Sequence, residues 1–309
     1  MPPVLDNFPD LALSIDELAR REIEDNKAKN RVALVVGACK REGNHPGIGM
    51  ATAYKLGLGM GFHVAGTYNS SASGAEELAE HFSRYSDGRD FLGIQANMDD
   101  YRESVPAMME QIKERFGRLD VVVYSVSRTV RAKQLLALQD GEVELTDDDW
   151  EDIITGNVHG FRKTAISAVE LMRENDYTPG PNGYRGKIIN LGSSSGVYFW
   201  SPNRAPYDAS KVAEDTIVKD VALETGRDGI LVMNLITSVV DSATIEPVRA
   251  KYHAWAGEKD DTGRFRHAAL GRIASPEEIT NVVSHLVSQG TTFSTGGTYE
   301  ATGGILTRL

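Results

Sequence analysis

Residues 32–49 read VALVVGACKREGNHPGIG, an apolar run followed by a segment with four glycines and two basic side chains. The run 32–36 is apolar at every position, as in a strand that is buried on both faces. A helical pattern begins at about Ile48, so the glycines lie in a turn that joins a strand to a helix. Such a turn presents backbone N–H groups to an anion, because glycine allows the backbone to come close.

The alternation of strand and helix that begins here continues to the end of the chain. Predicted strands lie at 32–36, 63–68, 91–96, 120–126, 187–192 and 230–236, with a last short run around Thr298. Predicted helices begin at about Ile48 and Gly74 and lie near 101–116, 147–173, 206–226 and 276–289. Strands rich in Val and Ile that are separated by helices predict an α/β fold, a Rossmann-type doubly wound parallel sheet in a single domain.

Residues 1–30 form a polar extension ahead of that domain, which we place at 31–309. The sequence Ser14-Ile15-Asp16-Glu17 is a capping box, and the apolar residues after it fall at helical spacing. We expect one amphipathic helix there, which either packs on a neighbouring subunit or covers the sheet.

The composition favours a soluble protein with a small-molecule partner. Of the 309 residues 41% are hydrophobic, and 33 basic against 44 acidic side chains give a formal charge of −11, which argues against binding to nucleic acid or to an anionic membrane surface. No basic-then-apolar leader begins the sequence and no apolar run approaches the ~18 residues of a membrane helix, so we expect a cytoplasmic protein. The single Cys39 cannot form an internal disulfide, and the histidines lack metal-ligand spacing, so no metal is predicted.

The first phosphate-facing glycine has two candidates. Gly43 has the right spacing to Gly47, whereas Gly37 stands where the strand ends. We favour Gly37, because a tight turn has to leave the strand at once. The segment between Gly37 and Gly47 is then an expansion of a normally short loop, and it carries Lys40 and Arg41.

A second set of residues points to proton transfer. Tyr207 and Lys211 are four residues apart, so they lie one above the other on one face of the predicted helix. An ammonium beside a phenol favours the phenolate, which lets the phenol exchange a proton at neutral pH and act as a general acid for a carbonyl oxygen. The serine run 193–195 follows the strand 187–192 on the ligand side of the sheet, where a hydroxyl can hold a substrate oxygen.

These pieces together resemble the short-chain dehydrogenase/reductases, in their single-domain NAD(P)-dependent branch, over about residues 31–304. The matching residues are Gly47-Ile48-Gly49, Asn69-Ser70-Ser71, Phe116-Gly117-Arg118-Leu119-Asp120, Asp149-Trp150 with Asn157, Ser193-Ser194-Ser195-Gly196, Tyr207 with Lys211, the segment 270–279 and Gly303-Gly304. The resemblance implies a homo-oligomer, usually a homotetramer or a homodimer.

The resemblance also implies roles for individual residues. Tyr207 is implied to be the proton donor, while Lys211 favours its ionisation and binds the nicotinamide ribose hydroxyls. Asn157 is implied to hold a water in a proton relay, and a serine to orient the carbonyl. Ser193 best fits the family's Ser-x-x-Gly, but its separation from Tyr207 is one residue longer than usual, which leaves Ser194 as the alternative.

Three stretches depart from the family pattern. Where the family generally has Asn-Asn-Ala-Gly after the fourth strand, residues 124–127 read YSVS, without a glycine. Where a Pro-Gly pair usually follows the strand that ends near Ile236, residues 238–239 read SV, and the expanded first loop is the third departure. These differences leave the subfamily open, whereas the residues that carry the chemistry are all present.

The predicted cofactor is NADP(H). An acidic residue after the second strand would accept hydrogen bonds from a ribose 2′-hydroxyl and repel a 2′-phosphate, but that strand is followed here by Asn69 and Ser70. Lys40 and Arg41 on the neighbouring loop supply donors and positive charge for a 2′-phosphate. The resemblance further places Asn97-Met98 near the adenine. The remaining predicted cofactor-binding residues are Gly37, Gly47, Ile48, Gly49 and Lys211.

The leading hypothesis is an NADPH-dependent ketoreductase that reduces a carbonyl of a bulky or ring-bearing small molecule. A lid is predicted at about 242–272, where aromatic residues recur, and Tyr198, Phe199 and Trp200 offer a second wall. An enoyl reductase of the same superfamily is the alternative enzyme, favoured by the YSVS stretch but not by the short spacing from Tyr207 to Lys211. A regulator that binds NADPH without turnover is the alternative from another class.

Overall fold

The computed structural model describes residues 15–42, 45–70, 72–129, 133–135, 143–180, 183–198 and 204–305. Its centre is a parallel sheet of seven strands in the spatial order β11-β10-β9-β6-β1-β4-β5. The strands are β1 (Val32–Val36), β4 (His63–Tyr68), β5 (Phe91–Gln95), β6 (Val121–Tyr124), β9 (Gly186–Ser193), β10 (Ile230–Thr237) and β11 (Thr298–Ala301). The strand order reverses between β1 and β6, so the sheet is doubly wound, as the sequence predicts.

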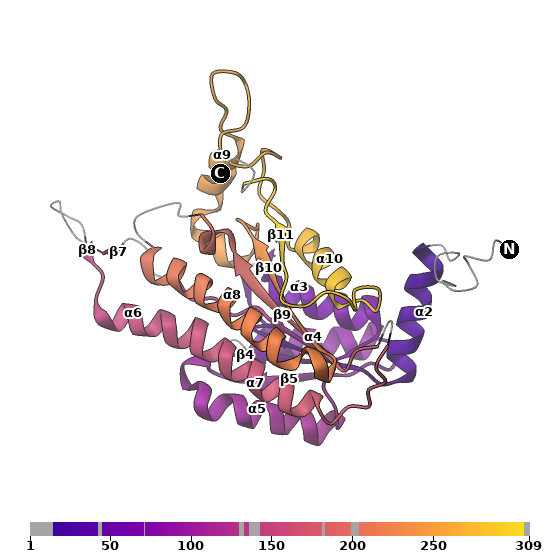
Figure 1. Cartoon of the computed structure of the whole chain (residues 1–309). Helices are drawn as coiled ribbons and strands as arrows, with labels where there is room; N and C mark the ends of the chain where they lie inside the picture. Colours follow the sequence, from indigo (N-terminus) through magenta and orange to yellow (C-terminus); the bar gives the residue numbers. More distant parts are fainter. Residues whose placement is uncertain are drawn as a thin grey trace.

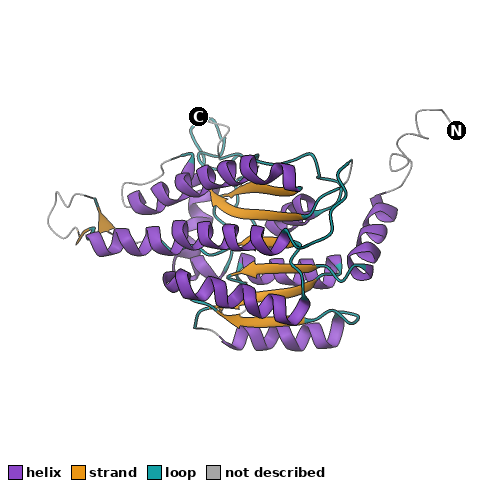
Figure 2. Cartoon of the chain, turned by 60° about the horizontal axis from the view of Figure 1, so that its bottom comes forward, coloured by secondary structure: helices purple, strands orange, loops and turns teal. Residues whose placement is uncertain are grey.

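Helices cover both faces of this sheet, which Figure 2 shows as strands enclosed between helices. One face carries α5 (Tyr101–Phe116), α7 (Gly160–Met172) and α8 (Ala205–Thr225), and the other carries α3 (Ile48–Tyr54), α4 (Ala72–Tyr85) and α10 (Pro276–Val287) (Figure 1). All five side chains of β1 are completely buried, alternately in one apolar layer and in the other. This two-sided burial explains why the strands are apolar at every position.

The predicted helix at 147–173 is present but is interrupted. It consists of α6 (Asp147–Ile153), a π-helical turn η4 (Ile154–His159) and α7. The predicted strand at 120–126 ends early, at Tyr124, and α4 begins at Ala72 rather than Gly74. A second π-helical turn, η2 (Lys55–Gly59), follows α3. Hydrophobic periodicity does not report one inserted residue in a helix, so these interruptions are not predictable from the pattern.

The N-terminal helix α2 (Ile15–Ala28) packs at the edge where the strands begin (Figure 1). Asn26 Nδ2 donates to Met60 O at 2.9 Å, and Glu22 Oε1 accepts from the Gln289 amide at 3.0 Å. These contacts attach α2 to loops of its own chain. Ser14, the first residue of the predicted capping box, lies outside the described residues.

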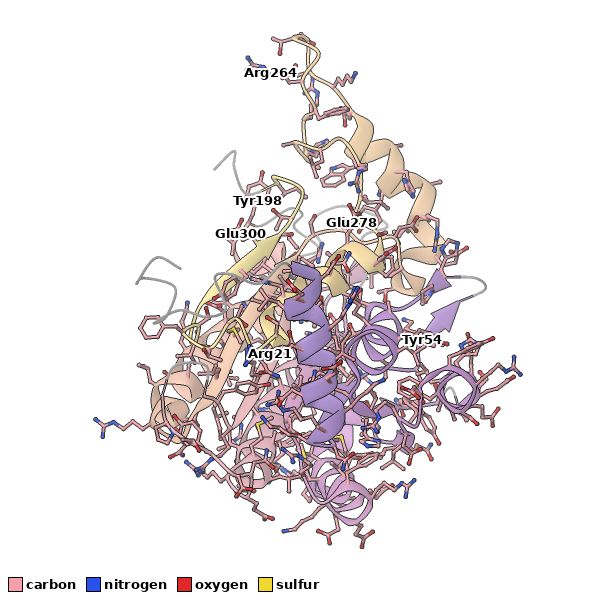
Figure 3. All side chains as sticks on the ribbon, turned by 90° about the vertical axis from the view of Figure 1, so that its right-hand side faces the viewer. Arg21, Tyr54, Tyr198, Arg264, Glu278 and Glu300 are labelled. Carbon is pink, nitrogen blue, oxygen red and sulfur yellow. The ribbon has the colours of Figure 1, made fainter. Side chains whose placement is uncertain are left out.

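After β10 the chain forms a 3-10 segment, η8 (Ala243–Val248), and the helix α9 (Arg249–Gly257), inside the range predicted as a lid. The loop that follows projects from the body of the protein, with Arg264 at its tip (Figure 3). Across the described ranges, no helix combines the length and the apolar character that crossing a bilayer requires.

Candidate active site

The glycine loop after β1 forms a compact turn, and the additional residues between Gly37 and Gly47 project from it. Gly37 has a φ of +83° and donates its N–H to Thr67 Oγ1 at 2.8 Å. A Cβ on Gly49 would stand 2.2 Å from Gly37 O, so the start of α3 lies directly on the end of β1. The Gly47 amide donates to Lys40 O at 2.7 Å, which closes the base of a short antiparallel hairpin. The hairpin pairs β2 (Arg41–Glu42) with β3 (His45–Pro46), and the sequence did not predict it.

This turn fits the pyrophosphate of a dinucleotide. Glycine at 49 lets the start of α3 lie against the backbone of Gly37, and Gly47 directly precedes the first turn of α3, where backbone N–H groups are available to an anion. Gly37 occupies the position that leaves the strand, which supports it as the first glycine, whereas Gly43 lies outside the described residues. Ile48, the first residue of α3, packs against the buried apolar layer under the helix.

The predicted adenine and ribose residues gather at the ends of β4 and β5. Asn69 Nδ2 donates to Asn97 Oδ1 at 3.4 Å, Ser70 is exposed beside them, and the Met98 side chain is buried. A Cβ on Gly74 would stand 2.0 Å from Cys39 O, so the loop that carries the exposed Lys40 touches the first turn of α4. The side chain of Arg41 is outside the described part of the structure.

Two of the departures from the family pattern have structural consequences. The buried Tyr124 hydroxyl donates to Gly156 O at 2.9 Å and thereby fixes the π-helical turn η4. In the turn after β10, the Ala274 amide donates to Val239 O at 3.2 Å and the Asp241 amide donates to Ala274 O at 2.7 Å. Hydrogen bonds to Ala274 therefore hold a turn that a Pro-Gly pair usually shapes.

Asn157 is fully buried in η4 and ties three elements together. Its Oδ1 accepts from the Arg128 amide at 2.7 Å, and its Nδ2 donates to Arg128 O at 3.0 Å and to Ser210 Oγ at 2.9 Å. The side chain thus connects the loop after β6 with α8, one residue from Lys211.

The serine run turns sharply at the end of β9. Ser193 is half-buried at the strand end, and its Oγ accepts from the Ser195 amide at 3.2 Å. Ser194 is only 2% exposed. Of the two serines that the sequence left open, Ser193 is therefore the more accessible at the ligand edge of the sheet.

Tyr207 and Lys211 lie on α8 as their spacing predicts, with Lys211 Nζ 5.7 Å from the centre of the Tyr207 ring. Arg204, just before the helix, places its guanidinium carbon 4.7 Å from the same ring centre. Arg204 was not recognised in the sequence, because its place over Tyr207 depends on how the chain enters α8.

Lys211 forms a buried ion pair with Glu214, another residue that the sequence analysis missed. The two side chains are 1% and 0% exposed, and Nζ lies 2.9 Å from Oε2. Burial alone would lower the pKa of Lys211, but the Glu214 carboxylate raises it above its ordinary value. The sequence spacing could have indicated this ion pair, because Glu214 follows Lys211 by three residues and so lies on the same face of the helix.

Two basic side chains that follow β6 in the chain, Arg128 and Lys133, have acidic partners. Arg128 pairs with Asp99, and Lys133 lies 2.6 Å from Asp149. Arg264 stands at the loop tip (Figure 3), and residues 131, 199 and 200 lie outside the described ranges.

The segment 242–272, which is predicted as a lid, contacts the hairpin in the loop after β1. Arg249 Nη1 lies 2.6 Å from His45 Nδ1 and 2.6 Å from Asp241 Oδ1, so one guanidinium joins the hairpin to the turn after β10. Beside α9, a pocket runs between this helix, α10 and the residues after β11. Its apolar lining includes Trp255, Leu270, Ile273, Val282 and Ile305.

Burial raises the pKa of the Cys39 thiol to about 12, so this residue stays protonated at neutral pH. Among the residues that the structure describes, no three His, Cys, Asp or Glu side chains are grouped to hold a metal ion.

The fold and this arrangement of Ser, Tyr, Lys and Asn are those of a short-chain dehydrogenase/reductase, and comparisons with known proteins agree. The family model described as "Enoyl-(Acyl carrier protein) reductase" matches residues 43–306. The chain therefore belongs to the short-chain dehydrogenase/reductase family, whose members are oxidoreductases.

Several relatives are similar over most of their length. The chain is 30% identical to the 3-oxoacyl-[acyl-carrier-protein] reductase FabG of Pseudomonas aeruginosa, over 90% of this chain and 98% of the relative. It is 27% identical to the versicolorin reductase stcU of Emericella nidulans, over 91% and 97%. Among solved structures, a Serratia marcescens short-chain dehydrogenase/reductase mutant aligns with a TM-score of 0.68 at 25% identity, over 89% of this chain and 97% of the other.

Proposed function

We propose that this protein is an NADPH-dependent ketoreductase that transfers hydride to the carbonyl of a bulky or ring-bearing small molecule, with Tyr207 as the general acid. The observation that carries the proposal is the position of Lys211 Nζ, 5.7 Å from the Tyr207 ring centre. The relatives named as 3-oxoacyl and versicolorin reductases support the same chemistry.

In this proposal the bound nicotinamide supplies the hydride, and residues of the chain manage the carbonyl oxygen. The Ser193 hydroxyl donates a hydrogen bond to that oxygen, and Tyr207 donates the proton that completes the alcohol. Lys211 holds a positive charge beside Tyr207 throughout. Asn157 keeps the loop after β6 in contact with α8, which fixes the distance between the two walls of the site.

The preference for NADPH is supported by the residues after β4, where Asn69 and Ser70 stand in place of a carboxylate, and by the exposed Lys40, whose loop touches the first turn of α4. Replacing Lys40 and Arg41 with Ala should weaken NADPH by about tenfold or more and NADH much less, since only NADPH carries the 2′-phosphate. Dissociation constants from nicotinamide fluorescence measure both. Lys113→Ala, on α5, is the matched control, and an equal loss for both cofactors would contradict the preference.

The lid is proposed at about 242–272, a range that contains η8 and α9. The catalytic domain is proposed at 31–309, preceded by the extension 1–30.

A homotetramer or homodimer is also proposed. Exposed apolar side chains on neighbouring helices support it, because solvent rarely meets such a surface in a monomer. They are Ile166 on α7 and Val212 and Leu223 on α8.

The test is NADPH oxidation over a panel of ketones, ring ketones, β-ketoacyl thioesters and enoyl thioesters, with Tyr207→Phe in parallel. We expect a keto compound to be reduced and the variant to lose at least about 100-fold in kcat, with NADPH binding retained. Retained turnover in the variant would remove Tyr207 from the role of acid.

The description of the matching family model favours an enoyl reductase as the second candidate. Turnover of the enoyl thioesters alone would establish it in place of the ketoreductase. Tight NADPH binding without turnover of any compound would favour the regulator.

A further inference from the structure

The hairpin in the loop after β1 is a feature that the proposed function does not use. It lies beside the first residues of α9 (Figure 3), where β2 runs next to η8. Arg249 Nη1 is 2.6 Å from His45 Nδ1 on the hairpin and 2.6 Å from Asp241 Oδ1 in the turn after β10. Its Nη2 is 2.6 Å from Glu246 Oε2 on η8. These four side chains form the Arg249 cluster, which joins the hairpin to the segment after β10.

The cluster holds the Arg249 guanidinium from several sides. The Arg249 side chain is only 17% exposed, and the carboxylates of Asp241 and Glu246 compensate its charge. Asp241 also lies 3.2 Å from His253 Nε2, and Arg249 Nη2 lies 3.4 Å from Ser242 O. Hydrogen bonds that involve a charged group are about twice as strong as those between neutral groups, so the attachment is more than a surface contact.

The two segments that the cluster joins follow strands that are not neighbours. In the sheet, β6 and β9 lie between β1 and β10. Because neighbouring strands are about 4.8 Å apart, the ends of β1 and β10 are separated by about 14 Å. The residues added between Gly37 and Gly47 supply the hairpin that extends toward η8, and the long side chain of Arg249 completes the contact.

The dinucleotide site lies between the same two segments. The pyrophosphate fits the turn at Gly47 and Gly49, while the nicotinamide has to reach the end of β9, where Ser193 lies. A dinucleotide bound in this way runs from the turn after β1 toward β10. The hairpin and the turn after β10 therefore flank the part of the cofactor that contains the pyrophosphate and the nicotinamide ribose.

We infer that the Arg249 cluster is a clasp that holds a bound nicotinamide dinucleotide in place and slows its release. Arg249 is a positioning residue in this role, because it acts through the hairpin and not on the reacting atoms. The inference rests on the proposed function, in which NADPH binds at this edge of the sheet.

The clasp concerns the part of the cofactor that NADPH and NADH share. Opening it should therefore speed the release of both by a similar factor. Removal of Lys40 and Arg41, in contrast, concerns the 2′-phosphate alone. Opening the clasp leaves Ser193 and Tyr207 in place, so the rate of hydride transfer in the loaded enzyme should stay the same.

The test measures how fast bound cofactor leaves the full-length protein. An excess of NADP⁺ displaces bound NADPH, and an excess of NAD⁺ displaces bound NADH, while nicotinamide fluorescence is followed by stopped flow. Arg249→Ala should raise the dissociation rate constant of both cofactors about tenfold or more, because it removes charge-assisted hydrogen bonds. Lys251→Ala, which removes an exposed positive charge from the same helix, should change it less than about twofold.

His45→Ala breaks the same contact from the hairpin side and should also speed release. The double variant should then be little faster than Arg249→Ala alone, because two substitutions that break one contact are not additive. If Arg249 binds the phosphates directly instead, its effect is independent of His45. Effects that multiply, or faster release in Arg249→Ala without any in His45→Ala, would overturn the clasp.

The outcomes also separate the clasp from the proposed function. Unchanged release in both variants of an enzyme that reduces a carbonyl contradicts the clasp alone. Faster and non-additive release without turnover of any carbonyl contradicts only the ketoreductase, and absence of binding of either cofactor to the wild type contradicts both. If Arg249→Ala does not fold, Arg249→Lys keeps the charge but loses the planar fork, and unchanged release in it overturns the clasp.

Discussion

Two lysines are buried at opposite ends of the sheet, and their surroundings differ. Lys211, 2% exposed, lies at the C-terminal ends of the strands against a carboxylate. Lys187, 0% exposed, is the second residue of β9 at the other end, and its Nζ donates to Ser288 O at 2.6 Å, to Leu286 O at 3.1 Å and to the side chain of Thr291 at 2.9 Å. Lys187 therefore caps the carbonyl end of α10.

The pKa values of the two lysines shift in opposite directions. Burial lowers the pKa of Lys187 to about 7, and the Glu22 carboxylate, which acts in the opposite direction, offsets this only in part. At Lys211 the carboxylate outweighs burial and raises the pKa. Both lysines also lie over a tyrosine ring, Lys187 Nζ at 4.9 Å from the centre of Tyr184 and Lys211 Nζ at 5.7 Å from that of Tyr207. Neither burial nor a nearby phenol therefore distinguishes them, and the difference lies in the bound carboxylate and in the edge of the sheet.

Removing each lysine tests this distinction most strongly. Lys211→Met should lower kcat/KM at least about 100-fold, because Tyr207 loses its charged neighbour and Glu214 its partner. Lys187→Met should change kcat/KM less than about twofold but lower the free energy of unfolding by about 1–3 kcal/mol, because the carbonyls at the end of α10 lose their donor. Assays and chemical denaturation measure both, and equal activity losses would abolish the distinction.

A smaller effect concerns the pH dependence of stability. The folded-state pKa of Lys187, about 7, lies below the unfolded value of 10.5, so the unfolded chain binds more protons between these pH values. The free energy of unfolding should therefore rise with pH above 7, by at most about 1.4 kcal/mol per unit relative to Lys187→Met. Denaturation of both proteins at several pH values checks this slope. Parallel curves would show that the carbonyls keep the ammonium charged.

The strands and most helices could be predicted from the sequence. Each extends over more residues than are needed to recognise its hydrophobic pattern. The run 32–36 and the stretch at 63–68 match β1 and β4 at both ends. The Tyr207-Lys211 pair could be placed because both residues lie on one helix, whose geometry fixes their distance.

The rest depends on contacts between distant segments. The hairpin from Arg41 to Pro46 closes through the hydrogen bond between Gly47 and Lys40, and the bond from Arg249 to His45 links residues far apart in the chain. The stabilising partner of η4 is Tyr124, from another strand. Local patterns contain no information on such partners.

The π-helical turn η4 also changes the phase of its helix. One extra residue in a helical turn rotates everything beyond it by about 100° relative to an uninterrupted helix. Residues of α6 and α7 that would lie on one face of an uninterrupted helix therefore point in different directions. Asn157 lies within this π-helical turn, and its side-chain amide points toward Ser210. Phe161, four residues later, faces the apolar layer of the sheet.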